Sequence, residues 1–376
     1  KVGVMRLVTG DELGIVKTFH AEAREVVSVP RAEQGRHLGI TNLAWADEDG
    51  SEFITNDRSG TLNFFKPGVG VTTSFALPEP SVSLQSLATQ RRVFTCSKEG
   101  SFRILQQRAG ESCAEIGSLQ FETPVGTFRV GPQASTVAYG GDELDLKIRN
   151  LDSGDFIFQG KNVKNDFLDL RQPVWITDLA FREDDAHVVT CTGYGQVRMY
   201  DIRAQRRPVF SVDKVSETRL LSLAVSHDQR WVATGDARGK VARVDLRQRK
   251  VCGTLKGALG AIRSLTFHPT LNYLATASLD RWLRVYDCTA RTLTHKVFLK
   301  QRLTSVLFTS DGLTLTAEEE ARPGKRRREV PDAGEESIWG KLEDAERTRA
   351  TALKEAQTKR KKSKGNTVAS KKKKKK

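Results

Sequence analysis

The chain has 376 residues, with 61 Lys or Arg against 46 Asp or Glu, and its formal net charge is +15. It contains no apolar run long enough to cross a bilayer, which argues against a membrane protein. Its five cysteines include no C-x-x-C pair, which argues against a disulfide framework or zinc site and favours free thiols in a reducing compartment. Residues 317–376 carry +9 of this net positive charge. Charge concentrated in one terminal segment indicates a binding partner or a targeting signal and says little about the fold.

After an N-terminal segment that predicts three strands, the chain repeats one pattern of short strands six times. The three strands are expected at Val4–Thr9, Leu13–Phe19 and Glu25–Val29. The repeats cover residues 38–77, 82–119, 123–160, 174–212, 218–256 and 260–300. Within each repeat, apolar residues alternate with polar or small ones, as strands with one buried face require. The first strands of the C-terminal copies end at Val225, Phe267 and Phe308, at spacings of 42 and 41 residues.

This period and the aromatic-Asp endings at Tyr200-Asp201 and Tyr286-Asp287 resemble the WD-repeat β-propeller family. The resemblance implies an all-β, seven-bladed propeller, which we place at residues 1–316. No repeat ends in Trp-Asp, and Gly257 stands without the expected His, so the family's buried Asp–His–Ser–Trp network is incomplete here. The N-terminal blade lacks one strand, and Leu303–Thr309 has the pattern of a first strand without followers. We therefore expect Leu303–Thr309 to complete that blade and close the ring.

The regular spacing breaks once, after a strand expected at Phe156–Gln159. Val130 and Phe181 end equivalent strands but lie 51 residues apart, so an insert, Gly160–Trp175, separates two blades. A long connection in an economical repeat is where function usually resides, and its basic and amide groups can donate to carboxylates or phosphates. We predict that it contacts a partner protein or RNA through Lys161, Asn162, Lys164, Asn165, Asp166, Asp169 and Arg171.

A structural alternative for the same insert is open. In that interpretation the apolar side chains of Phe167, Leu168 and Leu170 plug the junction between two blades. Asn165 and Asp166 then cap local turns, because short polar side chains accept backbone N–H bonds.

The composition changes after Leu315, and we assign residues 317–376 to a C-terminal tail. Residues 336–358 are helix-competent, with an apolar face that would dock either in a partner's groove or on the propeller. Two basic blocks resemble bipartite nuclear-import signals: Lys325, Arg326, Arg327, Arg328 and Lys359, Arg360, Lys361, Lys362. The Lys-rich end should be disordered and would bind RNA without sequence specificity, although a purely solubilising role is the alternative.

Catalysis finds no support in the sequence. The six histidines show neither metal-ligand spacing nor a nucleophile motif beside them. The segment Gly235–Lys240 has too few residues between its glycines for a phosphate loop, and Val241 stands where Ser or Thr would bind Mg²⁺. We therefore expect no enzyme, no metal and no cofactor.

A more specific resemblance begins at the insert. The run Lys161–Arg171 followed by Trp175, and TCTGYGQVRMYD at Thr190–Asp201, resemble the WD repeat-containing protein 74 family. Further agreement comes from KVFLK at Lys296–Lys300, RRPV at Arg206–Val209, VDLRQ at Val244–Gln248 and SIW at Ser337–Trp339. Fungal members of that family are assembly factors of the 60S ribosomal subunit.

The resemblance implies a non-enzymatic scaffold of the nucleolus and nucleus that acts in large-subunit assembly and rRNA processing. Its partners would be proteins of the pre-60S particle and ribosomal RNA, with release by an AAA-type ATPase, and it would be a monomer within that assembly. Two alternatives remain open. Tyr200–Arg203 and Val244–Arg247 approach the W-D-x-R pattern of cullin-type ubiquitin ligase receptors, and a generic nuclear propeller on chromatin is the other.

Overall fold

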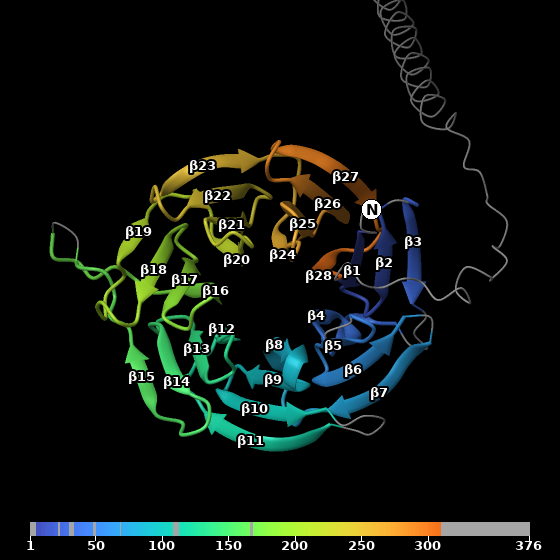
Figure 1. Ribbon diagram of the computed structural model, residues 1–376, viewed down its shortest axis with the longest axis horizontal. Helices are drawn as coiled ribbons and strands as arrows, with labels where there is room; N and C mark the ends of the chain where they lie inside the picture. The colour runs from blue at the N-terminus through green and yellow to red at the C-terminus, as the bar shows by residue number, and fades with distance from the viewer. Residues whose placement is uncertain are drawn as a thin grey trace, which may run out of the picture. The chain divides into compact units, whose positions relative to one another are not determined.

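The computed structural model describes residues 5–309, apart from residues 22, 30–33, 48–49, 68, 108–112 and 166–167. Within them, 28 strands form seven four-stranded antiparallel sheets that surround a central channel as the blades of a propeller (Figure 1). Two 3-10 helices, Arg36–Leu38 and Ala88–Gln90, lie between strands. The predicted all-β, seven-bladed propeller is therefore confirmed. The helix expected at residues 336–358 and the two basic blocks lie outside the described residues.

Each blade is numbered by its order in the ring, and its strands are given from the channel outward. Blade 1 contains β28 (Leu303–Phe308), β1 (Arg6–Asp11), β2 (Val16–His20) and β3 (Glu25–Val29). Blade 2 contains β4 (Ile40–Trp45), β5 (Phe53–Asp57), β6 (Thr61–Lys66) and β7 (Gly70–Ala76). Blade 3 contains β8 (Ser81–Leu87), β9 (Arg92–Ser97), β10 (Ser101–Gln106) and β11 (Ala114–Gln120). Blade 4 contains β12 (Thr127–Val130), β13 (Thr136–Gly140), β14 (Lys147–Asn150) and β15 (Phe156–Gln159).

The remaining three blades repeat this order of strands. Blade 5 contains β16 (Ile176–Phe181), β17 (His187–Thr192), β18 (Val197–Asp201) and β19 (Phe210–Val212). Blade 6 contains β20 (Leu220–Val225), β21 (Trp231–Asp236), β22 (Val241–Asp245) and β23 (Lys250–Leu255). Blade 7 contains β24 (Ile262–Phe267), β25 (Tyr273–Ser278), β26 (Trp282–Asp287) and β27 (Thr292–Phe298). No helix in the described part of the chain is long and apolar enough to cross a membrane.

Burial differs between inner and outer strands because each blade packs face to face on two neighbours. β25 is buried at five of its six positions, whereas β27, on the rim, is exposed at five of its seven positions and half-buried at the other two. The apolar clusters lie between consecutive blades: one joins Ala275 and Val285 of blade 7 to Leu7 and Phe19 of blade 1. Neighbouring blades therefore stabilise each other by burying apolar side chains between them.

Blade 1 is assembled from both ends of the described chain. β28 pairs antiparallel with β1, with Leu7 opposite Phe308 and Thr9 opposite Val306. This is the strand that the sequence analysis expected at Leu303–Thr309. The pairing satisfies the inner edge of β1 with a strand of its own chain, so the ring has no open blade.

The turn after β1 differs from the prediction in its boundaries. Leu13 was expected in a strand, but its backbone N–H donates to Asp11 Oδ1 at 3.0 Å, and Ile15 N–H donates to the same oxygen at 2.9 Å. The carboxylate closes a turn there, so β2 begins only at Val16. A short acidic side chain that accepts backbone N–H bonds ends the strand pattern earlier than hydrophobic alternation indicates.

Acidic turn residues of blades 7 and 1 form largely buried ion pairs. Asp280 accepts Arg284 Nη2 at 2.6 Å and Trp282 N–H at 3.1 Å, and the Arg284 side chain is 2% exposed. Burial alone would raise the pKa of Asp280, but the bonds from Arg284, Leu259 and Trp282 outweigh it and hold the pKa below its usual value. In blade 1, Asp11 pairs with the buried Lys17 at 3.1 Å.

Candidate functional site

The insert Gly160–Trp175 connects β15 of blade 4 to β16 of blade 5. Its described part projects from the rim of the ring between β15 and β19 (Figure 1). Its base is fixed by backbone contact, because Lys161 N–H donates to Arg206 O at 2.8 Å. Trp175 at its other end forms an antiparallel bridge with Asp142. The predicted contact residues therefore lie on a loop that is anchored at both ends.

Asn162 connects the insert to blade 5. Its Oδ1 accepts from Arg198 Nη1 at 3.0 Å, and its Nδ2 donates to Gln172 O across the base of the insert. Arg198 lies in β18, is 2% exposed, and donates from Nη2 to Gln196 Oε1 at 2.7 Å. Asn162 is thus used within the protein, and the sequence did not reveal this because its partner lies 36 residues away.

The outer part of the insert is held by a local contact. Asn165 Nδ2 donates to Asp169 Oδ1 at 2.8 Å, and Asp169 has a left-handed backbone with φ +58°. The plugging alternative does not hold for Leu168 and Leu170, whose side chains are 64% and 59% exposed. Asp166 and Phe167 lie outside the described residues.

The three cations of the insert differ in their partners. Arg171 Nη2 lies 3.5 Å from Glu143 Oε2, with both side chains more than half exposed, so this ion pair is weak. Burial raises the pKa of the neighbouring Asp145, and the positive charges of Arg171 and Arg198 oppose that rise. Lys161 and Lys164 are exposed and form no ion pair with any described residue. These two lysines are the cations of the insert that a partner can reach most directly.

A second feature is the central channel, which the seven innermost strands enclose. Its cavity measures about 860 Å³ and is lined by residues of β28, β4, β8, β12, β16, β20 and β24. The third residue of every one of these strands is polar: Asn42, Ser83, Arg129, Asp178, Ser222, Ser264 and Ser305. We did not predict this site from the sequence, although the polar residue that recurs at the third position of each innermost strand indicates it.

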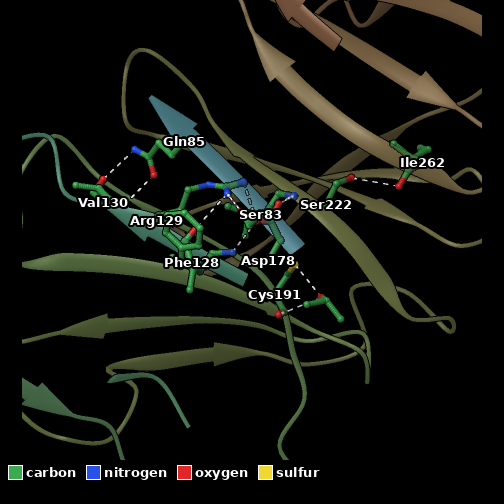
Figure 2. Close-up of polar contacts among 12 residues, drawn as sticks. Ser83, Gln85, Phe128, Arg129, Val130, Asp178, Cys191, Ser222 and Ile262 are labelled. Carbon is green, nitrogen blue, oxygen red and sulfur yellow. Dashed lines mark hydrogen bonds and ion pairs between the residues drawn. The ribbon is translucent and has the colours of Figure 1, made fainter. Parts of the chain in front are cut away.

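One ion pair ties four consecutive blades together at the channel wall. Arg129 Nη2 donates to Asp178 Oδ1 at 3.0 Å, and Arg129 Nη1 donates to Ser83 Oγ at 3.3 Å (Figure 2). Asp178 Oδ2 also accepts Leu223 N–H at 2.9 Å. Ser83, Arg129, Asp178 and Leu223 belong to blades 3, 4, 5 and 6, so the pair acts as a brace between neighbouring blades.

Chemistry that needs a metal has no cluster to support it in the described residues. No group of three or more His, Cys, Asp or Glu side chains there could hold a metal ion. The channel and the insert present charged groups and hydrogen-bond donors on a closed ring of blades.

Seven four-stranded blades around a channel with a recurring polar lining define this protein as a seven-bladed β-propeller. The WD domain, G-beta repeat family matches it at residues 249–287. WD repeat-containing protein 74 of Bos taurus is 31% identical over 353 residues, covering 89% of this chain and 89% of that protein. The Homo sapiens protein of that name is 31% identical over 367 residues, covering 93% and 92%. The chain belongs to the WD repeat-containing protein 74 family, which confirms the resemblance found in the sequence.

A fungal relative is named for ribosome biogenesis. Ribosome biogenesis protein nsa1 of Schizosaccharomyces pombe is 30% identical over 393 residues, covering 92% of this chain and 97% of that protein. The similarity therefore extends over nearly the whole length of both chains.

Proposed function

We propose that this protein is a ribosome biogenesis factor that serves as a docking platform on precursors of the large ribosomal subunit. The observation that carries this proposal is the near full-length similarity to a protein named for ribosome biogenesis. The fold agrees with such a role, because a closed ring of blades presents several rigid surfaces at once. The protein acts by binding rather than by catalysis, in the nucleolus and nucleus, and an AAA-type ATPase releases it from the particle.

The insert is the proposed contact of this platform with its partner. Lys161 and Lys164 place two exposed positive charges on an anchored loop, and Arg171 adds a third beside Glu143. Cations held on a fixed loop lose little conformational freedom when they meet carboxylates or phosphates. Exposed Leu168 and Leu170 supply apolar area beside these charges.

The test reverses the three charges of the insert together, as Lys161→Glu, Lys164→Glu and Arg171→Glu. Association with pre-60S particles should fall at least about tenfold in sucrose-gradient co-sedimentation, because attraction to an acidic partner becomes repulsion. The control is Arg91→Glu, Arg249→Glu and Arg291→Glu, which makes the same charge change at exposed turns of blades 3, 6 and 7. Equal sedimentation of the variant and the wild type would mean that the insert is structural.

Affinity purification of the tagged protein, with and without RNase, tests the proposed process itself. Large-subunit precursors and assembly proteins are the expected recovery, and sensitivity to RNase distinguishes RNA from protein contacts. Recovery of a cullin adaptor or of chromatin instead would contradict the proposal.

A further inference from the structure

Three arginines gather at one mouth of the central channel. Arg58 begins the turn between β5 and β6, Arg219 precedes β20, and Arg263 is the second residue of β24. Arg58 and Arg263 line the channel, and all three side chains reach solvent, although the channel wall partly encloses that of Arg263. They come from blades 2, 6 and 7, so ring closure is needed to bring Arg58 to the other two.

Backbone hydrogen bonds show that the three residues lie at the same end of the ring. Arg58 N–H donates to Gly39 O at 3.0 Å, so the turn after β5 lies beside the entry to β4. In blade 6, Ala237 N–H donates to Arg219 O at 3.1 Å, so the turn after β21 likewise lies beside the start of β20. Because the first strands of all blades start at this end, Arg263 near the start of β24 belongs to the same mouth.

The charges of this group are unbalanced. Partial burial lowers the pKa of Arg263, and the positive charges of Arg58 and Arg219 lower it further, so both of these guanidinium groups lie near enough to act on Arg263. Among the described residues, none of the three side chains forms an ion pair. Carboxylates in the adjacent turns have other partners. Glu12 lies 3.6 Å from Arg302, Glu217 lies 4.0 Å from Arg238, and the buried Asp57 accepts from Ser59, Thr61 and Asn63.

Arg129, on the opposite wall of the channel, differs from these three arginines because it has a carboxylate partner. Arg129 in the same channel has its carboxylate, Asp178, at 3.0 Å. Like charges without a counter-ion repel each other, so the arginine group is electrostatically unfavourable unless an anion from outside the chain neutralises it.

We propose that Arg58, Arg219 and Arg263 form a binding site for the phosphates of single-stranded RNA at this mouth of the channel. Guanidinium groups bind phosphate oxygens in a bidentate fork. An acidic peptide fits less well, because protein hot spots are apolar or aromatic pockets and the strands here have their edges already paired.

The choice of RNA as the occupant rests on the proposed function. The site is tested by fluorescence polarisation with a labelled twelve-nucleotide oligouridylate and the full-length chain. The variant is Arg58→Gln, Arg219→Gln and Arg263→Gln, and its matched control is Arg91→Gln, Arg249→Gln and Arg291→Gln. The control residues lie in turns at the opposite end of blades 3, 6 and 7 and lose the same charge.

The variant should bind about tenfold more weakly, and the slope of log affinity against log salt should fall by about 0.7 for each lost phosphate contact. The RNA affinity of the control should differ from that of the wild type by less than about twofold, because its three arginines lie away from the proposed site and the remaining basic residues are the same in both proteins. The melting temperature of the variant should be unchanged or higher, because repulsion is relieved; an arginine needed for folding would lower it.

Equal loss of affinity in variant and control would overturn the inference, because net charge alone would then explain binding. So would cross-links from a 4-thiouridine oligonucleotide that fall only on residues 317–376, or competition by octaglutamate as strong as by unlabelled oligouridylate. Either result would leave the proposed function standing. Failure to recover ribosomal precursors in cells, with the expected result in vitro, would instead contradict the proposed function and keep the site.

Discussion

Asp178 shows how much a single side chain can hold together in this ring. Its two oxygens accept from Arg129 of blade 4 and from the backbone of Leu223 in blade 6, while its own strand belongs to blade 5. The side chain is 12% exposed, so its charge is largely withdrawn from water and depends on these donors. Removing one partner of such a buried pair leaves an uncompensated charge.

Asp178→Ala should lower the free energy of unfolding by about 3 kcal/mol, because Arg129 and the Leu223 N–H lose their acceptor. Asp178→Asn should cost less, since the amide oxygen can still accept from Leu223. Urea unfolding followed by circular dichroism measures both effects.

The matched control is Glu115→Ala, which breaks the Arg103–Glu115 pair at 2.8 Å on the rim, where the side chains are 24% and 37% exposed. It should cost less than about 1 kcal/mol, because exposed ion pairs contribute little. If Asp178→Ala unfolds at the same urea concentration as this control, the brace between blades does not stabilise the ring.

Among the elements, β28 decides whether the ring is closed. It supplies the inner strand of blade 1, and its Leu303, Val306 and Phe308 are no more than 3% exposed. Burying each such side chain stabilises the protein by about 1.5–3 kcal/mol. Without β28, the edge of β1 and the apolar cluster around Leu7 and Phe19 would face water.

A chain that ends at Gln301 should therefore melt at least about 10 °C below a chain that ends at Thr309, or aggregate on expression. Differential scanning calorimetry of the two truncated proteins makes the comparison. Both lack residues 310–376, so the contribution of that region cancels. Equal melting temperatures would show that seven complete blades are unnecessary for a stable ring.

At the scale of the whole molecule, charge is divided between the propeller and residues 317–376, which carry a net +9 out of +15. We propose two roles for the basic blocks there: nuclear import, and attraction to RNA through release of counterions. Both roles belong to the composition of the chain and need no particular fold.

Deleting residues 359–376 should reduce nuclear accumulation of a fluorescent fusion and weaken RNA affinity at low salt, with little effect near 300 mM salt. Microscopy and electrophoretic mobility shifts measure the two effects. A variant that also carries a heterologous import signal separates them, since import should recover while RNA affinity stays low. Normal behaviour on both counts would leave this segment without an assigned role.

The repeat of strands, the break at Gly160–Trp175 and the family could be predicted from the sequence, because each is a local pattern. Alternation of apolar and polar residues reports which face of a strand is buried, and a period of about 42 residues reports a repeated unit. The boundaries near Leu13 were wrong because a side-chain contact from Asp11, rather than hydrophobicity, ends the strand.

Only the tertiary structure decided which polar residues meet. Asn162 contacts Arg198, Arg129 contacts Asp178, and Arg58 and Arg263 line one channel although 205 residues separate them in sequence. Local periodicity fixes the direction in which each side chain points from its strand. It carries no information on which blades face each other across the axis, because that depends on how many blades close the ring and on how they pack.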